Sequence, residues 1–394
     1  MDETPEIEPK AARPPFVHRS GAFSLGKVLG IPVFVDYSWL LIFFLVTLTI
    51  SQDFAQEHPM WSPAQHWFAG VLTSILFFVC VFLHEMSHCL VARRFGIPVL
   101  SITLFIFGGV AQLREEPRKP LHEFLIAIAG PLASVILGVG FFLLSTVTPA
   151  SGKNPWILQV SFVWLAHINW MLATFNMIPG FPLDGGRVLR SVVWAVSGRF
   201  DQATRIAAGF GSFIAYFFIA TGIYVAFFRQ LFIQGLWTTF IGWFLLMAAR
   251  SSVVQLATRR VFASLKVADV LEEIPMRVSP AMSVQALVDG PILQHGFVAF
   301  IVEDDGILRG MVTLQEVKAM PREEWPNTPL QTIMIPAGDL VVVEPSISLL
   351  TVMGAMDERG ISQMPVVEED RVVGIVTREG LLRVLRNQME FGSK

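Results

Sequence analysis

The stretch LTSILFFVCVFLHEMSHCLVA, residues 72–92, decides how the rest of the chain is to be interpreted. It is long and apolar enough for a membrane-spanning helix, and Glu85 is the one formally charged side chain within it. An HExxH run on a helix places two imidazoles, His84 and His88, on one face at metal-chelating distance, with a carboxylate beside them. Because ionisable groups are costly in a membrane, this run predicts a functional site. A polar patch satisfied by neighbouring helices is the alternative.

Composition and charge indicate a membrane domain followed by a soluble one. The 394 residues are 53% hydrophobic, with a mean hydropathy of +0.57. Residues 36–250 carry 21 charged side chains, whereas residues 251–394 carry 32, with acidic groups ahead of basic ones by 19 to 13. This acidic excess argues against nucleic acid as a partner. Cys80 and Cys89 would lie about 13 Å apart on one helix, too far for a disulfide.

Loop charges predict how the chain crosses the membrane. The predicted spans are residues 37–52, 67–93, 121–147, 156–178, 206–228 and 231–250. Lysine and arginine alternate between abundant and scarce along the connecting segments, beginning and ending abundant, which predicts that both termini are cytoplasmic. The apolar run 97–113 lies between two basic clusters, so it is predicted to be a re-entrant loop or hairpin rather than a span. A loop lying on the membrane interface is the alternative.

An internal repeat defines the soluble part. Val302–Thr313 aligns without gaps with Val366–Thr377, and each copy reads as two strands around an acidic turn, followed by a helix. The predicted order is a cytoplasmic arm, a membrane domain, a linker and two small α/β modules, at residues 1–35, 36–250, 251–266, 267–320 and 328–388.

A third metal ligand is expected because catalytic zinc sites use three protein ligands and an open position for water. The candidate is Asp184, in the stretch NMIPGFPLDGGR at residues 176–187. Pro179 and Pro182 are expected to break the fourth helix near its cytoplasmic end, and the glycines let the backbone fold tightly around Asp184. A solvated aspartate in a helix C-terminal turn is the alternative.

Several stretches resemble the site-2 protease family of intramembrane zinc metalloproteases (peptidase family M50B), in the branch that carries cystathionine-β-synthase-type (CBS) domains. The matching stretches are GIP (30–32), LHEMSHCLVARRFG (83–96), FGGVAQL (107–113), AIAGPLAS (127–134) and FNMIPGFPLDGGRVLRS (175–191). The resemblance implies an α-helical polytopic membrane domain, with six transmembrane helices plus a re-entrant loop, followed by a soluble α/β tandem CBS module.

The resemblance also implies the roles of the polar residues in the spans. His84, His88 and Asp184 would bind one Zn²⁺ per chain, and Glu85 would be the general base that takes a proton from the attacking water and delivers it to the leaving amine. The protein would then be an intramembrane zinc metalloendopeptidase (EC 3.4.24.-) that acts in regulated intramembrane proteolysis.

Substrate contacts are implied at three further positions. Asn176 would donate to the oxyanion or the substrate backbone, with a helix-capping or interhelical amide as the alternative. Gly108 and Gly109 lie in the family's re-entrant element, which is thought to present a strand edge to an unwound substrate. The implied substrates are transmembrane segments of single-span proteins, cleaved near the cytoplasmic face.

The repeat implies a ligand of its own, because CBS pairs typically bind adenine nucleotides. Thr313 and Thr377 would contact phosphate, and Glu316 of the first copy would reach a ribose. The second copy has Gly380 at the corresponding position, which cannot do so. A module for homodimerisation or docking is the alternative.

Two other classes of function compete with the protease. A CBS-regulated transporter or channel would need ionisable residues spread along a pathway, whereas here they converge on one HExxH run and one aspartate. An inactive protease-like membrane scaffold would be expected to have lost Glu85 or a metal ligand. The sequence therefore favours the protease.

Overall fold

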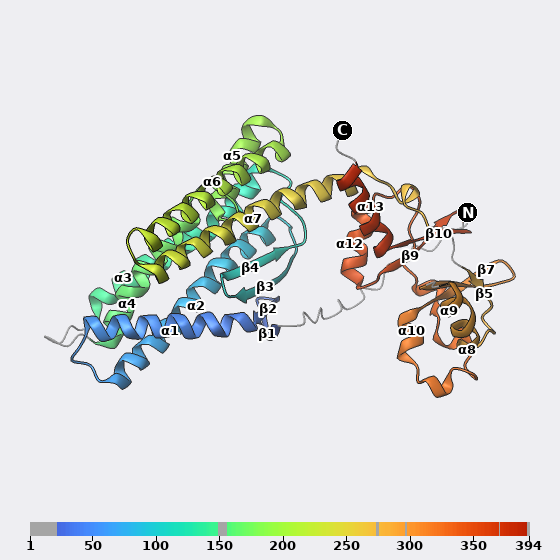
Figure 1. Cartoon of the computed structure of the whole chain (residues 1–394), viewed down its shortest axis with the longest axis horizontal. Coiled ribbons are helices and arrows are strands. Elements are labelled where there is room, and N and C mark those ends of the chain that lie inside the picture. Colours follow the sequence, from blue (N-terminus) through green and yellow to red (C-terminus); the bar gives the residue numbers. More distant parts are fainter. Residues whose placement is uncertain (1–21, 149–155, 273–275, 296–297, 370, 392–394) are drawn as a thin grey trace, which may run out of the picture. The chain divides into compact units, whose positions relative to one another are not determined.

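The computed structural model describes residues 22–148, 156–272, 276–295, 298–369 and 371–391 (Figure 1). These residues belong to two compact units, and the chain passes from the first to the second between Leu256 and Ala257.

Long apolar helices make up most of the first unit. Six of the described helices are long and apolar enough to cross a membrane: α1 (Tyr37–Glu57), α2 (Pro63–Arg94), α3 (Pro120–Val147), α4 (Ile157–Asn176), α6 (Phe200–Phe227) and α7 (Phe232–Ser264). Each covers most of one predicted span, and the chain is a multi-pass membrane protein. Helix α1 begins where the Asp36 carboxylate accepts from the Ser38 N–H, and α2 begins with a capping box formed by Ser62 and Gln65.

Two features of the helices differ from the predicted ones. Helix α7 continues to Ser264, through most of the predicted linker at 251–266. A further helix, α5 (Asp184–Ser197), lies between α4 and α6 and was not predicted. At 14 residues it is about 21 Å long, too short to cross a hydrocarbon layer of about 30 Å.

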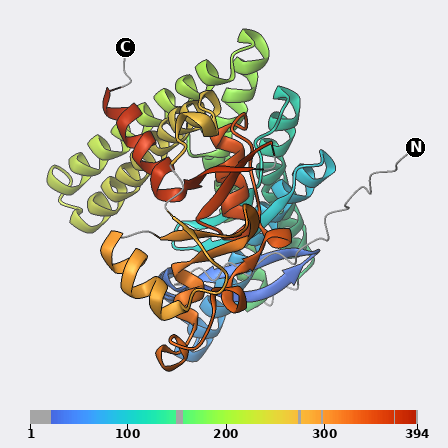
Figure 2. The same cartoon turned by 90° about the vertical axis from the view of Figure 1, so that its right-hand side faces the viewer.

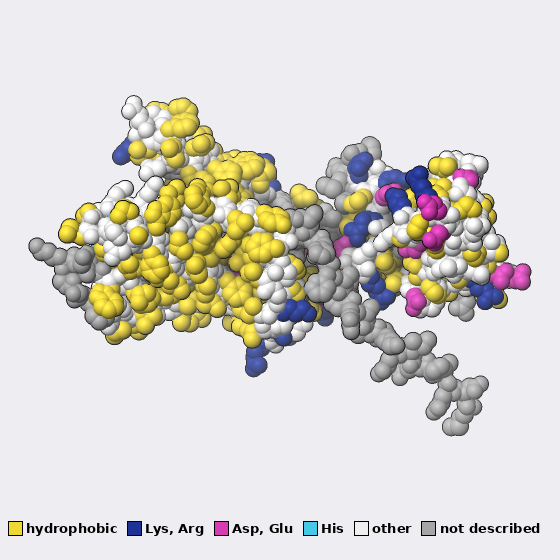
Figure 3. All heavy atoms as spheres, turned by 90° about the horizontal axis from the view of Figure 1, so that it is seen from below, with side chains coloured by type: hydrophobic (Ala, Val, Ile, Leu, Met, Phe, Trp, Pro, Cys, Tyr) yellow, Lys and Arg dark blue, Asp and Glu magenta, His cyan; other side chains and the backbone are white. Residues whose placement is uncertain are grey.

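The outer faces of the helices are apolar. Phe44 on α1, Phe217 on α6 and Ile233 on α7 are 56%, 63% and 82% exposed. Figure 3 shows hydrophobic side chains covering the visible face of the helical unit. Such a surface would be an aggregation hazard in water, but it is the surface expected against lipid.

Helices approach one another closely where small residues face a neighbour. A Cβ built on Gly70 of α2 would lie 2.0 Å from Oγ of Ser51 on α1, and one built on Gly222 of α6 would lie 2.3 Å from Oγ1 of Thr239 on α7. Because apolar burial gives little drive between helices in lipid, such close backbone contact is a main source of their association.

A four-stranded β-sheet packs beside α2. Its strands, in spatial order, are β1 (Ala22–Val28), β2 (Ile31–Asp36), β3 (Val99–Phe105) and β4 (Gly108–Leu113). The first and last pairs are antiparallel, and β2 and β3 are parallel, with Val33 opposite Ile102. The predicted re-entrant segment is thus the β3–β4 hairpin, whereas the β1–β2 hairpin in the predicted arm was not expected. Ile31 and Ile102 pack with Met86 and Cys89 of α2, which fixes the sheet beside the HExxH run.

The second unit contains the two copies of the repeat (Figure 2). The first module comprises β5 (Arg277–Val278), α8 (Val284–Leu287), a π-helical turn (Val288–Ile292), α9 (Leu293–His295), β6 (Ala299–Asp304), β7 (Ile307–Thr313), α10 (Leu314–Ala319), α11 (Leu330–Ile333) and β8 (Ile335–Pro336). The second comprises α12 (Leu349–Arg359), β9 (Gln363–Glu368), β10 (Arg371–Thr377) and α13 (Arg378–Phe391). In both copies an antiparallel hairpin leads into a helix, as the repeat predicted.

The end of α7 and the segment that follows it belong to the second module. Phe262, Val267 and Val270 are buried in the core of that module. Glu272 forms an isolated bridge with Ile375 of β10. The predicted boundary at 267 assigned this segment to the first module, but its apolar side chains complete the core of the second.

Candidate metal centre

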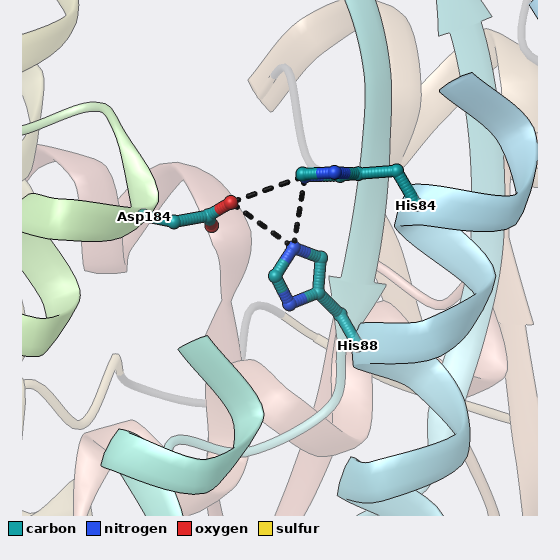
Figure 4. Close-up of side chains that lie close together, drawn as sticks. All are labelled: His84, His88 and Asp184. Atoms are coloured by element: carbon teal, nitrogen blue, oxygen red, sulfur yellow. Dashed lines mark hydrogen bonds and ion pairs between the residues drawn. The ribbon is translucent and has the colours of Figure 1, made fainter. Parts of the chain in front are cut away.

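Three polar side chains from two distant parts of the chain meet in the first unit. His84 and His88 lie one turn apart on α2, and Asp184 is the first residue of α5 (Figure 4). Oδ2 of Asp184 lies 3.1 Å from Nε2 of His84 and 3.2 Å from Nε2 of His88, and the two Nε2 atoms are 3.3 Å apart. Both imidazoles are buried, at 3% and 4% exposure.

This triangle has the dimensions of a zinc site. Tetrahedral zinc with bonds of about 2.0–2.1 Å places neighbouring ligand atoms about 3.3 Å apart. The three observed separations are 3.1, 3.2 and 3.3 Å. Three protein ligands leave the fourth corner for water or substrate, which is the arrangement of catalytic rather than structural zinc sites.

Helix α3 orients both imidazoles through their other ring nitrogens. Nδ1 of His88 lies 2.6 Å from the Ile126 carbonyl oxygen, and Nδ1 of His84 lies 2.9 Å from Oγ of Ser134. A carbonyl oxygen only accepts, so Nδ1 of His88 carries a proton; when the ring is neutral, its lone pair is therefore on Nε2, the atom that would bind a metal. An outer hydrogen bond of this kind fixes the direction of a metal ligand.

Gly130 of α3 faces the two ligating nitrogens. A Cβ built on Gly130 would lie 2.2 Å from Nε2 of His88 and 2.5 Å from Nε2 of His84. Ile126, Gly130 and Ser134 are four residues apart, so they share one face of α3. The space in which the ligand atoms meet therefore depends on the absence of a side chain at 130.

Tight backbone packing places Asp184 at the start of α5. A Cβ built on Gly185 would lie 2.4 Å from the Met177 carbonyl oxygen, and one built on Gly186 would lie 2.4 Å from the Phe181 nitrogen. The turn after α4 thus folds directly onto the first residues of α5. This is the compact arrangement around Asp184 that the glycines predicted.

The ionisation of Asp184 matches the role of a ligand. Burial raises the pKa of its carboxyl, but His88 and His84 outweigh burial and hold the pKa below its ordinary value. Asp184 is therefore a carboxylate at neutral pH, with a negative charge available to a cation.

Glu85 lies against β4. A Cβ built on Gly109 would lie 2.4 Å from Cγ of Glu85, and the backbone N–H of Ala111 donates to the Glu85 carboxylate. Gly108, at the hairpin turn, has a φ of +121°, a conformation that favours glycine. Because β4 is an edge strand of the sheet, the predicted base sits beside a strand edge.

Asn176 is half-buried at the end of α4.

The predicted nucleotide residues lie in the second unit, and both hydroxyls already have carboxylate partners. Thr313 donates to Glu316, the third residue of the helix it caps. Thr377 donates at 3.0 Å to Glu272, which comes from outside the repeat. A Cβ built on Gly380 would lie 2.8 Å from Glu272 Oε1, so Glu272 takes the place of the carboxylate that the second copy lacks.

The residues of α3 that face the site had no predicted role. A backbone carbonyl such as that of Ile126 has no side-chain signature at all. A signal for the other two was present in AIAGPLAS, where Gly130 and Ser134 lie four residues apart on one helical face.

Comparison with known proteins places the chain in a family. The model of peptidase family M50 matches residues 72–153 and 149–221, and that of the CBS domain matches residues 330–387. A candidate zinc metalloprotease of Synechocystis is 33% identical over 365 residues, which cover 92% of this chain and 95% of that protein. The chain belongs to peptidase family M50. Rip3 of Mycobacterium tuberculosis, also a candidate zinc metalloprotease, is 32% identical over 92% of this chain and 93% of its own length.

Membership of family M50 makes the protein a membrane metalloprotease of the site-2 protease type with an appended CBS region. Among solved structures, the site-2 protease from Methanocaldococcus jannaschii is 29% identical, with a TM-score of 0.43, and the match covers 59% of this chain and 95% of that one.

Proposed function

We propose that the protein is an intramembrane endopeptidase that cleaves transmembrane segments of membrane proteins near the cytoplasmic face. The observation that carries the proposal is the triangle of His84, His88 and Asp184, with ligand atoms 3.1–3.3 Å apart and Glu85 on the same helix as the two imidazoles. Peptide hydrolysis needs an activated water, a polarised carbonyl and a proton carrier.

The side chains divide this chemistry among them. Zinc, when bound, would polarise the scissile carbonyl and lower the pKa of water toward about 7. Glu85 accepts a proton from the attacking water and passes it to the leaving nitrogen, while the Ala111 N–H keeps its carboxylate on the side of β4. Asn176 donates a hydrogen bond to the oxyanion or to the substrate backbone.

Strand β4 is proposed to hold the substrate. A transmembrane helix must unwind before its backbone can enter a hydrolytic site, and an added strand would keep it extended. Strand β4 pairs with β3 along one side, and Gly108 and Gly109 leave the first two positions of β4 without side chains. Single-span membrane proteins are the proposed substrates because one helix must enter and unwind.

The location of the basic residues supports cleavage near the cytoplasmic face. His88 lies five residues before Arg93, about 7.5 Å along α2, and Arg187 lies one turn after Asp184 on α5. If both termini are cytoplasmic, as the loop charges predict, water reaches the site from that side without crossing the apolar layer.

Adenine nucleotide at the CBS region is a finer part of the proposal. A nucleotide phosphate would have to displace Glu316 from Thr313, or Glu272 from Thr377. Calorimetric titration of the full chain with AMP and ATP, for the wild type and for Thr313→Val, tests this. Absence of binding would leave homodimerisation or docking as the role of the modules.

The experiment that tests the function uses purified protein in vesicles with a membrane-embedded reporter. The wild type should hold about one zinc per chain, and His84→Ala or Asp184→Ala should lose both metal and cleavage. A chelator should stop cleavage, and added zinc should restore it. His167→Ala is the matched control, because this exposed histidine on α4 is outside the triangle. Undiminished cleavage by metal-free protein would overturn the proposal.

A further inference from the structure

A buried ion pair joins α3 to α5 close to the proposed metal site. Glu123, near the start of α3, is 0% exposed, and Arg190 of α5 is 8% exposed. Nε of Arg190 donates to Glu123 Oε1 at 2.6 Å, and Nη2 forms an ion pair with the same oxygen. Burying two charges is costly unless their arrangement serves a purpose, and fixing one structural register is the best-attested purpose.

The guanidinium of Arg190 is fixed from several other directions. Nη1 lies 3.4 Å from Oε2 of Glu116, in the segment before α3. The Phe181 and Phe200 rings, just before and just after α5, lie 5.0 and 4.7 Å from the guanidinium carbon. Arg190 is thus held by groups that flank α5 at both ends as well as by α3.

One face of α3 contacts both histidines of the proposed site and the helix that carries Asp184. Ile126 and Ser134 hydrogen-bond to His88 and His84, and Gly130 lies against both rings. Glu123 is three residues before Ile126, so it lies on the same face. This face holds the two histidines directly and holds the helix of Asp184 through Arg190.

We propose that Glu123 and Arg190 are positioning residues that set the register of α5 on α3 and thereby place Asp184 against the two histidines. The inference rests on the proposed zinc site. Arg190 lies six residues after Asp184, about 9 Å along one short helix. A slip of α5 by one residue turns it by about 100°, which would remove Arg190 from Glu123 and Asp184 from the imidazoles together.

The competing explanation is that the pair contributes only to the stability of the fold. In that case zinc affinity would follow thermal stability, whichever residue is changed. Removing one charge leaves the other buried and unpaired, which destabilises the fold. Replacing both with apolar groups removes that penalty, but the register of α5 on α3 is then no longer specified. The double variant therefore separates positioning from stability.

The test measures the zinc dissociation constant by chelator competition and the melting temperature, on the full chain in detergent. Variants are Glu123→Gln, Arg190→Met, Arg190→Lys and the double variant Glu123→Leu with Arg190→Met. Phe54→Leu is the control for stability, because Phe54 is buried far from the metal site. It packs in a cluster with Ala69 of α2, and Ala69 lies 15 residues, or about 22 Å along the helix, before His84.

We expect Glu123→Gln and Arg190→Met to weaken zinc binding about 10-fold, the lower end of the range for loss of a direct partner of a ligand, because the pair acts on Asp184 through α5. Arg190→Lys should weaken it less. The double variant should have a higher melting temperature than Arg190→Met, but its zinc affinity should stay low. Phe54→Leu should lower the melting temperature and leave the zinc affinity unchanged. Recovery of affinity in the double variant, or wild-type affinity in Arg190→Met, would overturn the inference. Failure of the wild type itself to bind zinc would instead overturn the proposed function.

Discussion

At the scale of single residues, Gly130 gives a direct test of where the ligand atoms meet. A Cβ at this position would lie 2.2 and 2.5 Å from the two ligating nitrogens, so Gly130→Ala should lose most of its zinc. Alanine favours a helix over glycine by about 0.5–1 kcal/mol, so the fold should persist. Metal analysis should show the loss for Gly130→Ala and full content for Gly140→Ala, on the same helix, whose built Cβ meets nothing within 4 Å. Equal zinc content in both would refute this geometry.

Ser134 permits a milder change at the same place. Its hydroxyl is the Nδ1 partner of His84, so Ser134→Ala should raise the zinc dissociation constant about 10–100-fold. Ser145→Ala is the control, since this buried hydroxyl bonds the Phe142 carbonyl of its own helix. If chelator competition gives the same affinity for both variants, Ser134 does not orient the ligand.

At the scale of elements, the contact of β4 with Glu85 separates catalysis from metal binding. A side chain at Gly109 would meet Cγ of Glu85 at 2.4 Å, so Gly109→Ala should displace the proposed base while leaving the histidines alone. We expect a fall in cleavage of about 100-fold, the lower end of the range for general acid–base catalysis, with unchanged zinc content. Leu100→Ala, at an exposed position of the neighbouring strand β3, should keep activity. Loss of zinc in Gly109→Ala would contradict this division.

The helices could be predicted from the sequence because a span is a local property of about 20 apolar residues. The sheet could not be predicted as fully: β2 and β3 pair in parallel across the whole of α1 and α2, and nothing in either strand specifies a partner so far away. Helix α5 was not predicted because its first turn contains Gly185 and Gly186, and adjacent glycines are typical of a loop.

The meeting of the candidate ligands was also predictable only in part. His84, Glu85 and His88 form a local motif, and Asp184 was identified from the glycines and prolines around it, although 100 residues separate it from His84. The contacts that α3 makes with the two histidines were not predicted, because the Ile126 carbonyl and the missing side chain of Gly130 have little signature in a single sequence. In the second unit, Gly380 indicated a missing carboxylate, but nothing indicated that Glu272 would supply it.

At the scale of the whole molecule, the orientation in the membrane has a simple test. If both termini are cytoplasmic, a cysteine replacing Glu57 should react with an impermeant thiol reagent from outside, and one replacing Arg118 only after the membrane is opened. The native Cys80 and Cys89 are both buried, so background labelling should be low. Labelling of both new cysteines from the same side would show that a span or the β3–β4 hairpin is wrongly oriented.

The central claim is that this chain hydrolyses peptides in the membrane with Glu85 as its base and with zinc on His84, His88 and Asp184. The most direct measurement compares wild type and Glu85→Gln for zinc content and for cleavage of a membrane-embedded reporter, in the same vesicles. Because Glu85 is outside the ligand triangle, the variant should keep about one zinc per chain and lose cleavage. Cleavage by Glu85→Gln at the wild-type rate would contradict the account.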